Sequence, residues 1–204
     1  MPVIRRLPRY YRFLYDLKEN GVTRISSREL SQRMGLTASQ IRQDLNCFGG
    51  FGQQGYGYMV EQLYDEIGRI LGVSQPTRAI LLGVGNLGKA VVNHMNFESR
   101  GFRLVGLFDG NPALVGQVQS DLPIRSNDEL EEFCRQEKPE MAILCIPKEA
   151  APELVERLVA CGIDAFWNFS HYDIAYDHPE VIVENVHMGD SLMTLSYLMN
   201  QKDS

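Results

Sequence analysis

The feature that most constrains the fold is a glycine-rich turn at the end of a short apolar run. The run Ala79–Leu82 leads into a G-x-G-x-x-G spacing at Gly83, Gly85 and Gly88, and a helical pattern follows. A strand, a tight turn and a helix in this order are typical of a dinucleotide-binding unit, whose phosphates lie at the helix start. Gly83 would permit the turn, Gly85 would let a pyrophosphate approach, and Gly88 would let the helix pack closely on the strand. The candidate phosphate-binding residues are Gly83, Val84, Gly85, Asn86, Leu87 and Gly88.

An acidic residue follows at the spacing that this unit requires. A second apolar run, Phe102–Phe108, ends in Asp109, which lies 21 residues after Gly88. A carboxylate there can accept hydrogen bonds from the adenosine ribose and would repel a 2′-phosphate, which favours NAD(H) over NADP(H). The alternative is an ordinary turn, because Asp-Gly-Asn-Pro is good turn chemistry. Pro147 and Asn168 fall at the ends of two more predicted strands, so we expect them at the same ligand-binding edge.

The pattern around this unit predicts an α/β fold with a Rossmann-like, doubly wound parallel sheet. Strands are expected at 141–146, 165–169 and 181–183, and helices at 127–137 and 150–161, which alternate as parallel strands with crossover helices do. Gly72–Pro76 has the composition of a linker. We therefore expect three parts: an N-terminal domain over 1–75, a nucleotide-binding domain over 76–186 and a terminal helix within 187–204.

The first part has the pattern of a winged helix-turn-helix. Two short predicted helices begin at capping boxes, at Ser26–Glu29 and Thr37–Gln40, and a glycine-rich segment over 49–58 suggests a wing. The outward face of the second helix carries Ser39, Gln40, Arg42, Gln43 and Asn46, and Gln54 lies at the wing tip. Arginine and amide side chains suit base edges in a major groove. A helical bundle with a solvated polar face remains the alternative.

Charge and composition narrow the class of protein. Residues 1–55 carry nine Lys or Arg and four Asp or Glu, although the whole chain has a formal net charge of −6. This basic N-terminal segment is suited to binding a polyanion. The four cysteines are scattered and indicate neither disulfides nor a metal site. No signal peptide is evident, and no apolar stretch reaches the roughly 18 residues that span a bilayer. We expect a cytoplasmic protein.

Taken together, these motifs resemble one family over essentially the whole chain. The segment Ile-Arg-Gln-Asp-Leu-Asn-Cys-Phe-Gly-Gly-Phe-Gly at 41–52, the turn Gly83–Gly88, Phe108-Asp109, Asn168-Phe169 and a terminal helix resemble the redox-sensing transcriptional repressors named Rex. The resemblance implies a homodimer that binds operator DNA when NAD⁺ is plentiful and is released by NADH. It also implies a terminal helix exchanged between subunits.

The chain departs from the family pattern at several positions. Gln43 stands where a second basic residue is usual, Gln53 and Gln54 occupy the wing tip, and Cys47 replaces a tyrosine. Each lost phosphate contact would weaken DNA binding and flatten its salt dependence.

Further departures concern the inter-subunit switch, which is the set of residues through which NADH binding would release the DNA. The usual Asn-Phe-x-Pro here reads Asn168-Phe169-Ser170-His171. Arg12 matches a basic switch residue, while His94 and His187, with Asp190 near the latter, stand at switch positions usually held by other residues. Histidine protonation could therefore enter the switch; ordinary polar substitution is the alternative.

Two other functions remain open at this point. An NAD-dependent dehydrogenase would need a substrate domain and a positioned acid or base, and the sequence offers neither, so no catalytic residue is assigned. A nucleotide sensor whose winged helix mediates only assembly would fit the reduced number of basic residues.

Overall fold

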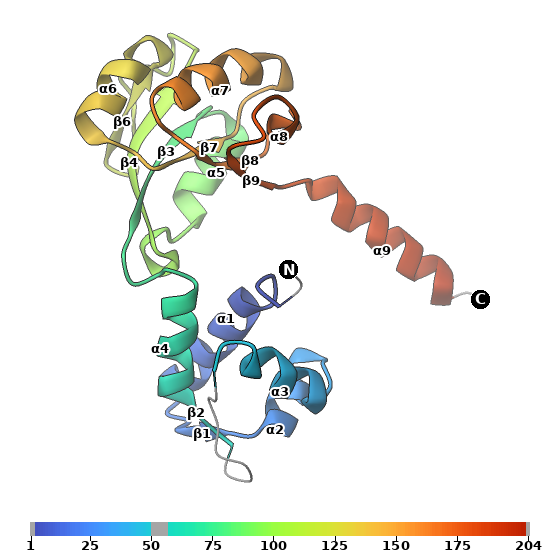
Figure 1. Ribbon diagram of the computed structural model, residues 1–204. Helices are drawn as coiled ribbons and strands as arrows, with labels where there is room; N and C mark the ends of the chain where they lie inside the picture. The colour runs from blue at the N-terminus through green and yellow to red at the C-terminus, as the bar shows by residue number, and fades with distance from the viewer. Residues whose placement is uncertain (1–2, 50–56, 203–204) are drawn as a thin grey trace. The chain divides into compact units, whose positions relative to one another are not determined.

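The computed structural model describes residues 3–49 and 57–202, and the chain divides into two compact units between Gln75 and Pro76. Figure 1 shows the helices of the first unit and the sheet of the second. Each unit has its own hydrophobic core.

The first unit is a helical domain with one small antiparallel sheet. Its elements are α1 (Leu7–Glu19), β1 (Arg24–Ile25), α2 (Ser27–Met34), α3 (Ala38–Asn46), β2 (Tyr58–Met59) and α4 (Val60–Ile70). The inward residues of α1, which include Leu7, Leu14 and Leu17, are buried in one core with Ile41 and Leu45 of α3. Burial of these apolar faces holds α3 against the rest of the unit.

The helix starts in this unit were largely predicted by their caps. The capping box of α2 is confirmed, because Glu29 N donates to Ser26 Oγ at 3.1 Å and Ser26 N donates to Glu29 Oε2 at 2.9 Å. At α3 the first half of the box forms, since Gln40 N donates to Thr37 Oγ1 at 3.1 Å. The Gln40 side chain instead donates to the Asp44 carboxylate at 2.8 Å, a charged and therefore stronger acceptor.

The wing is described only in part. Residues 50–56 of the expected hairpin, with Gln53 and Gln54, lie outside the described residues. The described part, β2, pairs with β1, so that Ile25 lies opposite Tyr58. The partner of β2 is therefore the strand before α2, which sequence reasoning did not predict because two residues carry no periodicity.

The second unit contains a seven-stranded sheet in the order β5-β6-β4-β3-β7-β8-β9, in which only the β5–β6 pair is antiparallel. The strands are β3 (Thr77–Leu82), β4 (Phe102–Asp109), β5 (Val118–Gln119), β6 (Leu122–Ser126), β7 (Met141–Leu144), β8 (Ala165–Asn168) and β9 (Ile182–Asn185). The six parallel strands have the order 3-2-1-4-5-6 of a doubly wound fold, with the switch point between β3 and β7.

Helices cover both faces of this sheet. They are α5 (Asn86–His94), α6 (Leu130–Glu137), α7 (Ala151–Ala160) and α8 (Ile174–Asp177), with 3-10 turns at Glu98–Arg100, Asn127–Glu129 and Lys148–Ala150. Residues of α6, α7 and α8 share a core with Ile80 and Leu144, whereas Val92 of α5 belongs to the core of the opposite face. Figure 1 shows α6 and α7 on one side of the sheet and α5 on the other.

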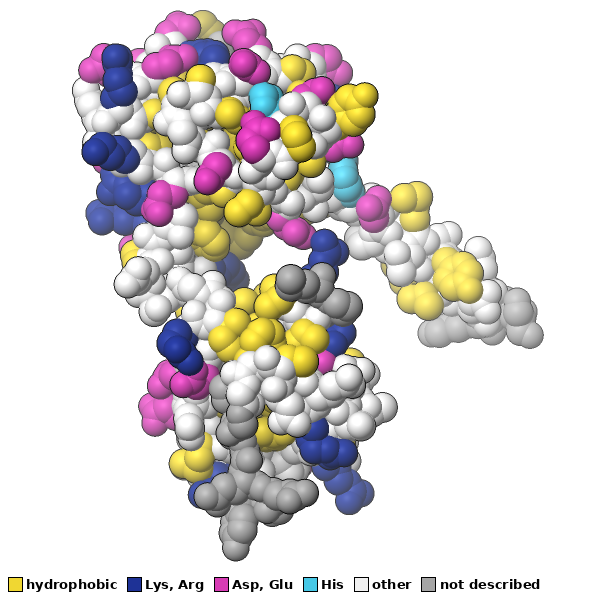
Figure 2. Space-filling view, in the orientation of Figure 1, with side chains coloured by type: hydrophobic (Ala, Val, Ile, Leu, Met, Phe, Trp, Pro, Cys, Tyr) yellow, Lys and Arg dark blue, Asp and Glu magenta, His cyan; other side chains and the backbone are white. Residues whose placement is uncertain are grey.

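The chain closes with α9 (Met188–Lys202). Its large apolar side chains are exposed: Met188, Leu192, Met193, Leu195, Tyr197, Leu198 and Met199. Figure 2 shows hydrophobic side chains along this helix. None of the helices in the described part of the chain is long and apolar enough to cross a membrane.

Candidate nucleotide-binding and nucleic-acid-binding sites

The glycine turn after β3 is held by two close backbone approaches. Gly83 has φ +91°, and a Cβ built on it would lie 2.5 Å from the carbonyl oxygen of Cys145. A Cβ on Gly88 would lie 1.9 Å from the carbonyl oxygen of Gly83. A side chain at Gly88 would push α5 away from the turn, and one at Gly83 would collide with the backbone after β7, so both positions require glycine for reasons internal to the fold.

Gly85 differs from its two neighbours in the motif. A Cβ built there meets nothing within 4 Å, and its φ of −72° is open to any residue. The protein itself does not demand glycine at this position, but a ligand close to the backbone would. The first hydrogen bond within α5 runs from Lys89 N to Gly85 O at 2.9 Å, so the N–H groups of Asn86, Leu87 and Gly88 point out from the helix start. This is a geometry that favours an anion.

Asp109 lies at the end of β4 and is fixed to the glycine turn. Its Oδ2 accepts a hydrogen bond from Val84 N at 2.7 Å, and its Oδ1 accepts one from Asn111 N at 2.8 Å. The N–H of Val84 is thus used within the protein and is not oriented toward a phosphate. Each carboxylate oxygen keeps a second lone pair, so the half-buried Asp109 can still accept hydroxyl donors from a ribose.

The two remaining candidates at this edge differ in exposure. Pro147 is exposed and precedes the 3-10 turn at Lys148–Ala150. Asn168 is only 1% exposed, and its side chain is fully used inside the protein. Its Nδ2 donates to Tyr172 O and to Asn185 Oδ1, both at 2.8 Å, and its Oδ1 accepts from Ser170 N and Oγ. The side chain of Asn168 therefore positions the turn after β8.

The switch candidates lie on different elements. His94 ends α5, Arg12 lies on α1 and Asp190 in the first turn of α9, and all three are exposed. His187 lies just before α9 and pairs with His171, whose φ is +60°; their Nδ1 atoms are 2.8 Å apart. The sequence did not single out His171 as a partner, because a contact between two loops has no sequence periodicity.

The outward face of α3 forms a shallow polar hollow. It is lined by Ser39, Arg42, Gln43, Asn46 and Cys47. Four of the five predicted DNA-reading residues of this helix are thus together on one open surface. The fifth, Gln40, is turned inward to Asp44, and Gln54 lies outside the described residues.

A buried carboxylate orients this helix. Asp44 is fully buried and accepts hydrogen bonds from Arg6 Nε at 2.7 Å, Arg6 Nη2 at 2.6 Å and the Tyr10 hydroxyl at 3.0 Å. Burial alone would raise the pKa of Asp44, but hydrogen bonds from Arg6, Gln40 and Tyr10 outweigh it and hold the pKa below its ordinary value. Sequence reasoning missed this residue. The available signal was its place on the inward side of α3, beside Ile41 and Leu45.

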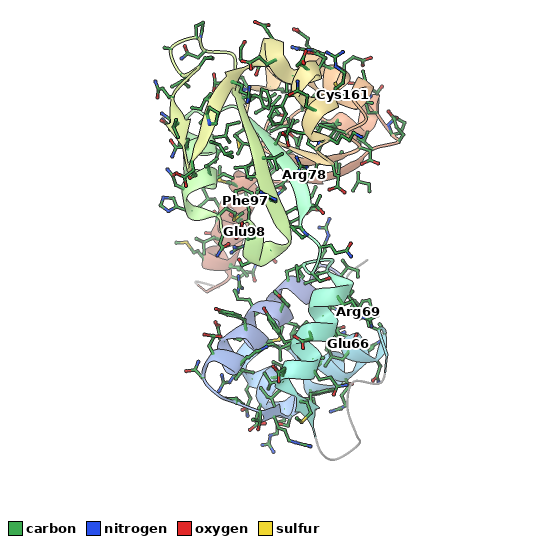
Figure 3. All side chains as sticks on the ribbon, turned by 90° about the vertical axis from the view of Figure 1, so that its left-hand side faces the viewer. Glu66, Arg69, Arg78, Phe97, Glu98 and Cys161 are labelled. Atoms are coloured by element: carbon green, nitrogen blue, oxygen red, sulfur yellow. The ribbon has the colours of Figure 1, made fainter. Side chains whose placement is uncertain are left out.

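An apolar groove of about 370 Å³ lies on the face of the sheet that α5 only partly covers. Its lining includes Phe97, Phe102, Met141, Ile143, Trp167 and Ile182. Figure 3 labels Phe97 in this unit. In the part of the chain that the structure describes, no group of three or more His, Cys, Asp or Glu side chains could hold a metal ion.

Known proteins match the chain over its full length. A family model described as "Putative DNA-binding protein N-terminus" matches residues 1–46, and one described as "CoA binding domain" matches residues 74–172. A redox-sensing transcriptional repressor Rex of Thermoanaerobacter sp. (strain X514) is 53% identical over 100% of this chain and 90% of its own length. Another, of Clostridioides difficile (strain 630), is 51% identical over 98% of this chain and 95% of its own.

Solved structures agree with these relatives. A structure of RSP in complex with NAD⁺ and operator DNA has a TM-score of 0.90 and 51% sequence identity, and covers 100% of this chain and 93% of that one. A structure of RSP in complex with NADH has a TM-score of 0.90 and 49% identity, and covers 100% and 95%. RSP is described as a Rex-family repressor.

Proposed function

Because this chain belongs to the family of redox-sensing transcriptional repressors named Rex, we propose that it binds operator DNA through α3 and carries NAD⁺ or NADH at the turn Gly83–Gly88. Members of this family are transcriptional repressors and not dehydrogenases, so the nucleotide is a signal and not a substrate. We assign DNA binding to residues 1–75, nucleotide binding to 76–186 and dimerisation to 187–204.

The observation that carries the nucleotide assignment is the contrast between Gly85 and its neighbours. Gly83 and Gly88 are required by close backbone contacts, whereas the space beside Gly85 is open. Asp109 faces the same turn, because its carboxylate accepts the N–H of Val84. A pyrophosphate beside Gly85 and a ribose beside Asp109 account for both features. Pro147 lies shortly after the neighbouring strand β7. The buried side chain of Asn168 holds the turn after β8 in place at the same edge of the sheet.

The signal requires that the two nucleotides differ in effect. A ligand shifts an equilibrium between DNA-binding and released states only by its difference in affinity for them. We propose that NADH favours the released state and that NAD⁺ permits DNA binding. Arg12, His94, His187 and Asp190 are our candidates for the residues that couple nucleotide to release.

We also propose a homodimer that exchanges α9. Leu192, Leu195, Leu198 and Met199 are exposed on α9, and so are Met193 and Tyr197. A helix with apolar residues on more than one side is suited to burial between surfaces. The apolar groove beside Trp167 offers one such surface on a second copy. Two copies would present two α3 helices to a palindromic operator.

We further propose that this protein acts in the cytoplasm, where operator DNA lies in bacteria.

A titration of labelled operator DNA tests the function. Fluorescence anisotropy of the full chain is measured without nucleotide, with NAD⁺ and with NADH, at several salt concentrations. We expect specific binding in the first two conditions and its loss with NADH. Equal effects of the two nucleotides would contradict redox sensing, and absence of specific binding in every condition would favour a sensor that acts through assembly.

The variant Gly85→Ala tests the nucleotide site itself. Its Cβ meets nothing in the protein, so we expect unchanged folding and unchanged DNA binding without nucleotide. It would intrude on a pyrophosphate, so we expect NADH affinity to fall at least about tenfold. Isothermal titration calorimetry measures that affinity, and an unchanged dissociation constant would place the nucleotide elsewhere.

A further inference from the structure

Two of the four cysteines meet between neighbouring helices. Cys134 lies on α6 and is buried, and Cys161 follows α7 and is half-buried. Both belong to the core that α6 and α7 form on one face of the sheet. Figure 3 labels Cys161 in this unit. Both thiols are free.

An ion pair sets the register of the two helices. Arg157 donates to the Glu131 carboxylate through Nε at 2.6 Å and Nη2 at 3.0 Å. Both helices connect parallel strands of the same sheet, so they run in the same direction. Cys134 lies about one turn beyond Glu131, and Cys161 about one turn beyond Arg157. Both cysteines thus lie about one turn beyond the ion pair, and the Cys161 thiol is a side-chain neighbour of the Cys134 thiol.

The environments of the two thiols are unequal. Burial, and then the neighbouring Cys161 thiol, raise the pKa of Cys134 to about 12. Cys134 is therefore protonated and shielded, whereas solvent reaches Cys161. Oxidants react with exposed thiolates, so the first attack falls on Cys161 and the buried thiol acts second.

We propose that Cys134 and Cys161 form a reversible dithiol–disulfide site for which hydrogen peroxide is the oxidant. In the first step the Cys161 thiol gives up its proton, its sulfur attacks one peroxide oxygen, and the O–O bond breaks. The departing hydroxide takes that proton, so Cys161 sulfenic acid and one water form. In the second step the Cys134 sulfur attacks the sulfenic sulfur, and the S–O bond breaks as an S–S bond forms. The thiol proton leaves with the hydroxyl as a second water. Two thiols are oxidised and one peroxide is reduced to two waters.

The other two cysteines serve as internal references. Cys47 is exposed, and its thiol donates to Gln43 O at 3.2 Å. Burial raises the pKa of Cys145 to about 12, and this cysteine belongs to the core of the opposite sheet face. Neither belongs to the core that holds Cys134 and Cys161, so the proposed disulfide is specific. It would link α6 to α7 covalently. The protein could then respond to hydrogen peroxide independently of the bound nucleotide.

Peptide mapping of the full chain tests the site. The protein is treated with hydrogen peroxide, its remaining thiols are alkylated, and the digest is analysed without reduction. We expect a peptide pair linked through Cys134 and Cys161 that disappears after treatment with dithiothreitol. We also expect a rise of several degrees in the melting temperature of the oxidised protein, because the link constrains the unfolded chain. Oxidation of Cys47 without a peptide pair linked through Cys134 and Cys161 would overturn the proposal. This outcome can be observed in the unaltered protein.

Variants assign the order of the two steps. In Cys134→Ala the resolving thiol is gone, so we expect Cys161 sulfenic acid to accumulate and to react with dimedone. Cys161→Ala should abolish both the adduct and the linked pair, whereas the control Cys47→Ser should leave both outcomes as in the unaltered chain. A dimedone adduct that is equal with and without Cys134 would contradict a resolving role for that residue.

Discussion

At the scale of single residues, Asp44 is the strongest example of a side chain that shapes the DNA-binding surface without belonging to it. It lies on the inward side of α3 and ties that helix to α1 through Arg6 and Tyr10. The same carboxylate draws Gln40 inward. The orientation of the exposed face, with Arg42 and Gln43, follows from this buried anchor.

Replacement of Asp44 should destabilise the first unit. We expect Asp44→Ala to lower the free energy of unfolding by about 2–4 kcal/mol, because Arg6 and Tyr10 lose their buried acceptor. Urea denaturation at pH 7 measures the change. Asp16→Ala removes an exposed carboxylate from α1 and should change the value by less than about 0.5 kcal/mol. Equal effects of the two substitutions would contradict the anchoring role.

The same carboxylate predicts a pH dependence. The pKa of Asp44 is lower in the folded protein than in the unfolded chain, so its contribution is complete above the unfolded-state pKa of about 3.9. It is lost as the pH falls through the folded-state pKa. The difference in unfolding free energy between the unaltered protein and Asp44→Ala should stay constant from pH 7 to about 5 and shrink below about 4. A difference that is constant below pH 4 would contradict the assignment.

Gln43 predicts a gain of function at one position. It is exposed in the polar hollow on α3, where the family pattern has a basic residue. We expect Gln43→Lys to tighten operator binding several-fold at low salt and to steepen the slope of log affinity against log salt by about 0.9, because one more phosphate is neutralised. Fluorescence anisotropy across salt measures both. Gln136→Lys adds the same charge on α6 of the second unit and should leave the slope unchanged; an equal effect would indicate net charge alone.

At the scale of elements, the junction of β3 with α5 contains one glycine that the fold requires, Gly88, and one that only a bound ligand would require, Gly85. Gly88→Ala would place a methyl group within the van der Waals radius of the Gly83 carbonyl oxygen, so α5 must move away from β3. We expect a loss of at least about 2 kcal/mol of stability, seen as a lower melting temperature. Gly85→Ala should retain the melting temperature of the unaltered protein. Equal melting temperatures of the two variants would contradict the inference that the fold requires glycine at position 88 but not at position 85.

Sequence reasoning predicted the elements that have a period or a cap. The turn at Gly83–Gly88 and the capping box at Ser26 are set by local chemistry, so the pattern was sufficient. The short elements β1, β5 and α8 were missed, because two to four residues carry no period. The inward turn of Gln40 and the full internal use of Asn168 could not be predicted either, since each depends on a partner brought close only by the fold.

At the scale of the whole molecule, α9 determines the expected assembly. We predict that Leu195→Asp places a charge on the apolar surface that a second copy would bury in the proposed dimer, and that it raises the dimer dissociation constant at least about tenfold. Sedimentation velocity over a concentration series measures this change. The control Gln201→Asp adds the same charge at a polar, exposed position of α9 and should leave the dimer intact. An unchanged sedimentation coefficient for Leu195→Asp would exclude α9 from the interface.

The hydrogen bonds of Asn168 also have a mechanical consequence. Asn168 O accepts from Val186 N at 2.9 Å, and its side chain grips Asn185, so the base of α9 is fastened to the carboxyl end of β8. With 15 residues, α9 is a rod about 22 Å long. A tilt of about 5° at its base displaces its far end by about 2 Å over that length. In the proposed dimer, a small shift at this edge of the sheet would therefore be amplified along α9 into a displacement large enough to break side-chain contacts at its far end.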